Sequence, residues 1–115
     1  MKAKKFVFDL DSKVAIYVPT TIDAVTKCDN SEMVKRVLTT LSNLFGGATA
    51  TDAVGGWVSS EHGLITERVT IVYSFCKSEV FADNIDAILE LCEAIKSEMS
   101  QEAVTLEYNG QVKFI

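Results

Sequence analysis

Histidine and proline occur only once each in this 115-residue chain, and its three cysteines are Cys28, Cys76 and Cys92. An odd number of widely spaced cysteines, without a CxxC pair, encodes no disulfide framework. A single histidine leaves no ligand pattern for zinc. We therefore predict no cofactor and no metal site, and a reducing cytoplasmic location is the simplest setting for this cysteine content.

The chain also lacks blocks of one charge and long apolar runs. Its 11 basic and 16 acidic residues are scattered and give a formal charge of −5. Because phosphate contacts supply most non-specific nucleic-acid affinity, an acidic chain without a basic run argues against a nucleic-acid partner. The apolar stretch after the basic start Met1–Lys5 is interrupted by Asp9, Asp11 and Lys13, so no secretory or membrane segment is predicted.

The hydrophobic content of 48% suits one domain, residues 1–115, with one hydrophobic core. Two strand-like runs, Lys5–Leu10 and Lys13–Val18, are joined by the turn pair Asp11-Ser12. Pro19 then ends the second run, since proline offers no amide hydrogen. The polar connection over 20–30 has the length of a segment that carries either function or disorder.

The first helix is predicted after the capping residues Asn30 and Ser31 and ends at Gly46-Gly47. A strand of small residues follows between the two glycine pairs, and Gly55-Gly56 indicates a bulge or a close backbone approach before Trp57. A sharper alternation runs from Leu64 to Phe75. We expect its apolar set to meet the helices and its polar set to face away, namely Ile65, Val69, Ile71, Tyr73 and Phe75 against Thr66, Arg68, Thr70 and Ser74.

Ser78 is expected to cap a second amphipathic helix, and Asn109-Gly110 between two alternating runs predicts a hairpin with a type I′ turn. The resulting order is strand, helix, two strands, helix, strand, with an extra strand at each end. This order predicts an α+β fold of the ferredoxin-like βαββαβ type, an antiparallel sheet with two helices on one face. The sheet face without helices is then expected either to be polar and in contact with water or to be covered.

Residue parity places Tyr17 and Arg68 on the face away from the helices, with Ala15, Thr70 and Thr105, and Trp57 joins them. Aromatic rings, a guanidinium and hydroxyls on an open sheet suit a planar or anionic small molecule, or a partner protein. The alternative is an ordinary threonine-rich sheet surface on which a second subunit packs. We expect a homodimer, formed through the sheet face or an edge strand.

Glu67 is a charged residue at a position where the alternation predicts an apolar one, because it lies in register with Ile65 and Val69. A carboxylate that faces a core needs a partner or a raised pKa, which makes it a candidate base or ligand contact. The alternatives are a side chain that reaches water near the strand end, or a bulge that removes the anomaly. An enzyme hypothesis gives Glu67 the role of base, with His62 or Tyr73 as acid and Arg68 holding an anion.

The segment Leu44–Phe75, with its Gly-Ala-Thr, Gly-Gly-Trp, Gly-Leu-Ile and Glu-Arg-Val-Thr positions, resembles the central part of small uncharacterised bacterial, phage and plasmid proteins. The resemblance implies a ferredoxin-like fold and a mobile-element setting, in which many small proteins bind and block host factors. No functional residue carries over from it. The preferred hypothesis is a binding protein, and the alternatives are a small dimeric enzyme of the isomerase or monooxygenase type and a purely structural subunit.

Overall fold

A five-stranded antiparallel sheet and three helices form the described part of the chain, residues 6–22 and 26–115 of a computed structural model. The sheet order is β4-β5-β1-β6-β7, and a separate pair, β2-β3, stands beside it. In chain order the elements are β1 (Ser12–Pro19), β2 (Thr21–Ile22), β3 (Thr26–Lys27), α1 (Ser31–Phe45), β4 (Thr49–Ser59), β5 (Gly63–Cys76), α2 (Ser78–Asp83), α3 (Ile85–Glu98), β6 (Thr105–Tyr108) and β7 (Gln111–Phe114).

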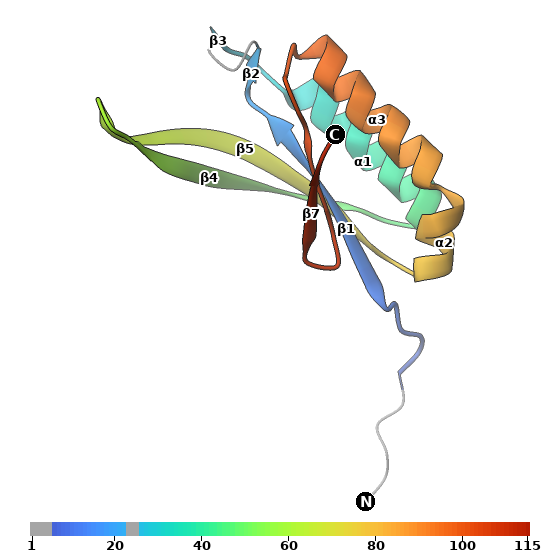
Figure 1. The fold of residues 1–115 in the computed structure, drawn as a ribbon. Coiled ribbons are helices and arrows are strands. Elements are labelled where there is room, and N and C mark those ends of the chain that lie inside the picture. Colours follow the sequence, from blue (N-terminus) through green and yellow to red (C-terminus); the bar gives the residue numbers. More distant parts are fainter. Residues whose placement is uncertain (1–5, 23–25) are drawn as a thin grey trace, which may run out of the picture.

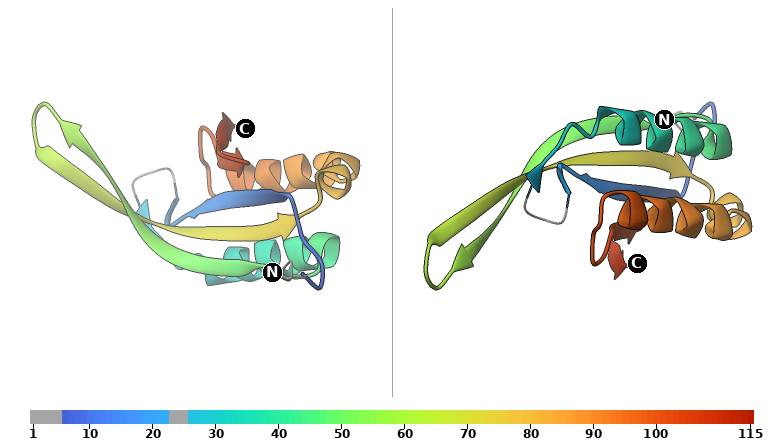
Figure 2. Two further views of the ribbon diagram at one scale, coloured as in Figure 1. Left: turned by 90° about the horizontal axis from the view of Figure 1, so that it is seen from below. Right: turned by 90° about the horizontal axis from the view of Figure 1, so that it is seen from above.

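The helices α1 and α3 cover the same face of the sheet (Figure 1), and Figure 2 shows them behind the sheet in one view and in front of it in the other. We call this side the helix face and the other side the open face. On the helix face, Ile16 of β1 and Val72 of β5 lie opposite each other and are fully buried. They pack against Val37 and Leu41 of α1 and Ile88 of α3. The core therefore lies between the sheet and one layer of helices.

Both predicted helices are confirmed, the second of them in two pieces. Helix α1 ends at Gly46, whose φ of +91° is the left-handed conformation that favours glycine. The second helix is broken at Asn84, whose side-chain amide donates to the carbonyl of Val80 at 2.8 Å. None of the described helices is both long enough and apolar enough to cross a membrane.

The N-terminal contacts of these helices differ from the sequence prediction. Ser78 does not cap α2 with its own side chain; instead the carboxylate of Asp11 accepts the Ser78 amide at 2.9 Å and the Ser78 hydroxyl at 3.2 Å. At α1, the Asn30 side chain makes no cap either, because it donates to the carbonyl of Pro19 and to the Thr70 hydroxyl. Each helix start is thus fixed to a remote part of the chain.

The C-terminal hairpin is confirmed, and the N-terminal strand prediction is wrong. Asn109 and Gly110 have φ angles of +51° and +80°, as a type I′ turn requires, and β6 pairs with β7 across them. Of the predicted strand Lys5–Leu10, Lys5 lies outside the described residues, and residues 6–10 form no strand. The Asp11 contact with Ser78 directs the chain toward the start of α2, away from the sheet edges (Figure 1). The polar connection over 20–30 contains β2 and β3, and its residues 23–25 lie outside the described part.

The strand β5 presents the opposite face from the one its sequence predicts. Its buried positions on the helix face are Thr70, Val72, Ser74 and Cys76. The larger set, Val69, Ile71, Tyr73 and Phe75, alternates with these positions and lies on the open face, opposite Pro19, Tyr17, Ala15 and Lys13 of β1. The expectation that this set meets the helices is therefore wrong.

Strands β4 and β5 continue beyond the rest of the sheet. The last pair between β1 and β5 is Pro19 with Val69, whereas β4 and β5 stay paired as far as Ser59 and Gly63. We call residues 54–68 the arm, and it projects past the helices in both figures. An isolated two-stranded ribbon is marginally stable in water, so the side chains at the base of the arm matter for its position.

Candidate functional site

The four residues that the sequence singled out, Tyr17, Trp57, Glu67 and Arg68, line one hollow at the base of the arm. Its volume is about 330 Å³, at the small end of the range for ligand sites. We call it the Trp57 hollow. Among the described residues, those that line it are Tyr17, Pro19, Gly55, Gly56, Trp57, Glu67, Arg68, Val69, Gln101, Ala103, Val104 and Thr105.

Tyr17 enters the hollow from the open face of β1. Its phenolic hydroxyl donates a hydrogen bond to the carboxylate of Glu107 at 3.0 Å. Burial, followed by this hydrogen bond and the negative charge of Glu107, raises the pKa of Tyr17 above its usual 10.0. The ring is therefore a neutral, fixed wall of the hollow at physiological pH, with a carboxylate beside it.

Trp57 and Gly55 of β4 are residues of the arm that line the hollow. In the β4-β5 register Trp57 lies opposite Ile65, and Gly55 lies opposite Glu67. The indole is 60% exposed, so most of the ring is open to a ligand. At Gly55 the absent side chain leaves room, since an added Cβ would meet only the Glu67 carbonyl oxygen, at 3.8 Å. The hollow thus has a flat aromatic side and a stretch of bare backbone.

Glu67 does not face the core, and of the alternatives that the sequence left open, a side chain that reaches water is the one observed. The side chain is exposed, and one of its oxygens accepts a hydrogen bond from the Thr21 hydroxyl at 3.2 Å. Because β5 turns its odd-numbered residues to the open face, Glu67 comes to the same side as Tyr17 and Trp57. It is a charged, accessible group beside two aromatic rings.

Arg68 and Thr70 are not on the face predicted for them. Thr70 is buried on the helix face, where its hydroxyl accepts from the Asn30 amide at 3.1 Å. Arg68 has the same strand parity and contributes to the hollow from the next position after Glu67, while its carbonyl accepts from the Thr20 hydroxyl at 2.7 Å. A neighbouring cavity of about 650 Å³ shares Trp57, Glu67 and Arg68 with the hollow.

The two acids proposed as partners of Glu67 lie elsewhere. His62 is in the turn at the far end of the arm, 3.7 Å from the carboxylate of Glu61. Tyr73 is six residues from Glu67 along β5, about 20 Å at the rise of a strand, and its ring lies under the Lys13 ammonium. Neither residue lines the Trp57 hollow, so the structure does not assemble that acid-base pair.

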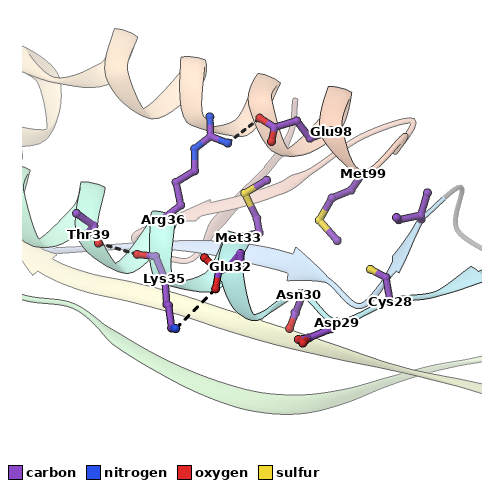
Figure 3. A pocket seen from close by; sticks show the side chains of 11 residues that line it. Cys28, Asp29, Asn30, Glu32, Met33, Lys35, Arg36, Thr39, Glu98 and Met99 are labelled. Carbon is purple, nitrogen blue, oxygen red and sulfur yellow. Dashed lines mark hydrogen bonds and ion pairs between the residues drawn. The ribbon is translucent and has the colours of Figure 1, made fainter.

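A separate cavity of about 490 Å³ lies between the start of α1 and the end of α3 (Figure 3). The thioethers of Met33 and Met99 and the thiol of Cys28 line it, a grouping that the sequence analysis did not find. Its cations are already engaged: Arg36 contacts Glu98 at 2.7 Å, and Lys35 lies 3.7 Å from Glu32 on the same helix. Within residues 6–22 and 26–115, no three His, Cys, Asp or Glu side chains gather into a metal-binding group.

The sequence matches no known family model and no curated protein. Two solved structures share its fold over almost the whole length. One is a phage SAM lyase in complex with S-methyl-5′-thioadenosine, with a TM-score of 0.65 and 17% identity, over 96% of this chain and 95% of that chain. The other is a phage SAM lyase in the apo state, with a TM-score of 0.67 and 16% identity, over 99% and 95%. At this identity the likeness establishes a shared fold.

Proposed function

We propose that this chain binds a small ligand that combines a flat heteroaromatic ring with a positive charge, and that S-adenosylmethionine is its model compound. The observation that carries the proposal is the meeting of Tyr17, Trp57 and Glu67 at one hollow. The likeness to the two phage SAM lyase structures supports the choice of compound. It also supports the mobile-element setting that the resemblance of Leu44–Phe75 implies.

The strand order supports the finer assignment of the fold as ferredoxin-like. Strands β4, β5, β1 and β6 are neighbours in this order, and each pair is antiparallel. The crossover through α1 joins β1 to β4 and leaves room for β5 between them, which is the split arrangement of that fold. Strand β7 is then an addition at the edge.

The charges around the hollow favour a cationic ligand over the anionic one expected from sequence. The carboxylate of Glu67 is exposed at the hollow, and that of Glu107 is fixed behind Tyr17 by a hydrogen bond. Among the described residues that line the hollow, Arg68 is the one cationic side chain and Glu67 the one carboxylate. A sulfonium next to aromatic faces and a carboxylate gains both cation–π and Coulomb attraction. The adenine ring would stack on the exposed indole of Trp57.

The reaction consistent with these neighbours is release of S-methyl-5′-thioadenosine. The bond between the sulfonium sulfur and the γ-carbon of the amino-acid chain breaks and the sulfur keeps the electron pair. Loss of a proton from the adjacent carbon forms a carbon–carbon double bond in the four-carbon fragment. In this proposal Glu67, which lines the hollow, accepts that proton, the role of base that the enzyme hypothesis from sequence gives it. Binding and reaction are separate claims, and the measurements below distinguish them.

The test follows the fluorescence of Trp57, the single tryptophan of the chain, as ligand is added to the purified protein. S-Adenosylmethionine and S-methyl-5′-thioadenosine should both change the indole emission. The matched variants are Glu67→Gln and Glu61→Gln, since Glu61 is an exposed carboxylate of the β4-β5 turn that does not line the hollow. Chromatography of the same mixtures measures release of S-methyl-5′-thioadenosine.

The expected result depends on ligand charge. Glu67→Gln should weaken binding of the sulfonium by about three- to tenfold, as for an exposed ion pair, and leave the neutral thioether within about twofold. Glu61→Gln should change neither. If neither compound alters the emission at millimolar concentration, the binding proposal is wrong. If both bind without release of the thioether, the lyase step alone is wrong.

A further inference from the structure

The open face of the sheet is more apolar than a solvated sheet face should be. An antiparallel sheet with one wet side ordinarily turns its polar residues toward water. Here β5 does the reverse, with Thr70 and Ser74 buried on the helix face and Ile71, Tyr73 and Phe75 on the open face. The neighbouring strand β1 adds Ala15 to that side, whereas β4 adds the exposed Thr49 and Thr51.

The edge strand β7 extends this apolar surface. Phe114 pairs with Thr105, and Val112 pairs with Glu107, whose own partner in β1 is the open-face residue Ala15. Phe75 is 54% exposed, Val112 52% and Phe114 72%. The face therefore carries large exposed side chains at both ends, with partly buried ones between them.

Three exposed aromatic side chains supply about half of the area that a stable interface needs. An aromatic side chain offers ~150–250 Å², so Trp57, Phe75 and Phe114 at their exposed fractions present roughly 280–460 Å². A standard interface buries about 800 Å² on each partner, and monomers rarely leave apolar patches of more than a few hundred. The partly exposed Val69, Ile71 and Tyr73, with Val112, extend the same surface.

The charge of the chain favours a second copy of the chain as the partner that covers the open face. The chain carries a formal charge of −5, so two copies repel each other over most of their surfaces. On the open face the ionisable acids and bases of the described strands are few, namely Lys13, Glu67 and Glu107. A basic protein partner would find few carboxylates there, whereas two identical acidic chains can meet there with little repulsion.

The shape of the chain adds a second argument. The radius of gyration is 16.2 Å, against about 13 Å for a compact domain of this length. Part of the difference is the arm, whose Trp57 lies on the open face and is exposed. A two-stranded ribbon of this kind gains stability when it lies against a neighbour.

We propose that a second copy of this chain covers the open face, with Phe75 and Phe114 in the contact. The test is sedimentation of the purified protein, from about 1 to 100 μM, with the variants Phe75→Glu and Phe114→Glu. Neither residue lines the Trp57 hollow, so ligand binding is tested separately. The control is Thr39→Glu, which adds the same charge on an exposed position of α1.

The wild type and Thr39→Glu should sediment as a multiple of the 12.6 kDa chain. Phe114→Glu should raise the dissociation constant by on the order of 100-fold, since a carboxylate would be buried without a partner. Phe75→Glu should raise it by less, because Lys13 lies opposite position 75 in β1. Circular dichroism checks that these exposed substitutions leave the fold intact. A wild type that stays monomeric at 100 μM overturns the proposal, and so does an oligomer that both variants leave unchanged.

Discussion

Adding one methyl group at Gly55 tests the Trp57 hollow without disturbing the fold. The new Cβ would stand on the open face, where the nearest atom is the Glu67 carbonyl oxygen at 3.8 Å, an ordinary contact. A glycine within a strand costs roughly 0.5–1 kcal/mol relative to alanine, because it loses more backbone freedom on folding. We therefore expect Gly55→Ala to stabilise the protein by about that amount.

The same methyl group should weaken ligand binding, because it narrows a cavity of about 330 Å³ beside Trp57. Overpacking of this kind typically costs about 1–3 kcal/mol, so affinity should fall by about fivefold or more. Gly47→Ala is the matched control, because Gly47 does not line the hollow and its added Cβ would meet no atom within 4 Å.

Two measurements on each variant decide the outcome, namely the denaturant midpoint and the ligand titration by Trp57 fluorescence. Gly55→Ala should keep or raise the midpoint and lose affinity, whereas Gly47→Ala should keep the affinity of the wild type. Loss of affinity in Gly47→Ala alone would refute the placement of the hollow. A Gly55→Ala protein that unfolds more readily would refute the open space assigned to that position.

Three further substitutions or treatments follow from contacts outside the hollow. The Ser78 amide, followed by smaller hydrogen-bond contributions, lowers the pKa of Asp11 below its usual 3.8. The stability that the Asp11 carboxylate adds is therefore present above pH 3.8 and is lost as the pH falls through the lower pKa of the folded protein. In Asp11→Asn, the melting temperature should depend less on pH below about 4. Leu41→Ala, at a fully buried position of α1, should cost about 2–5 kcal/mol in urea unfolding, against less than about 0.5 for Thr39→Ala. Burial, with a smaller effect of the Glu93 charge, raises the pKa of Cys92 to about 11, so native alkylation followed by mass spectrometry should modify the partly exposed Cys28 first.

Local signals were enough to predict the helices and the C-terminal hairpin. The stripe ending at Gly46 predicts α1, and Asn109-Gly110 predicts the β6-β7 turn, because positive φ angles restrict the residue types at such positions. The prediction of an N-terminal strand was wrong because the strand propensity of residues 6–10 does not by itself determine that another strand pairs with them. The side chain that holds the start of α2 is Asp11, 67 residues away, and no local pattern encodes such a contact.

The four candidate residues line one hollow, but the sequence did not predict how they are arranged. Alternation along β5 correctly separates Glu67 from Arg68, but it cannot say which set faces the helices. The apolar character of the odd-numbered residues favoured placing them against the helices, which is wrong. Because β5 turns these residues to the open face, Glu67 lies on the same face as Tyr17, and Arg68 does not. The aromatic and carboxylate groups of the hollow meet because of that reversal of the predicted faces, together with the register that places Gly55 opposite Glu67.

The reversal has a physical cause in the polar residues of β5. The Ser74 hydroxyl donates to the carbonyl of Gly47 at 2.6 Å, just after α1, and the Thr70 hydroxyl accepts from Asn30, just before it. Both buried hydroxyls are therefore paired, and each fixes one end of the helix to the sheet. Once these positions face the helices, Ile71 and Tyr73 must face the other way. The apolar open face is then a consequence of how α1 is held, and leaving it uncovered would expose surface that folding ordinarily buries.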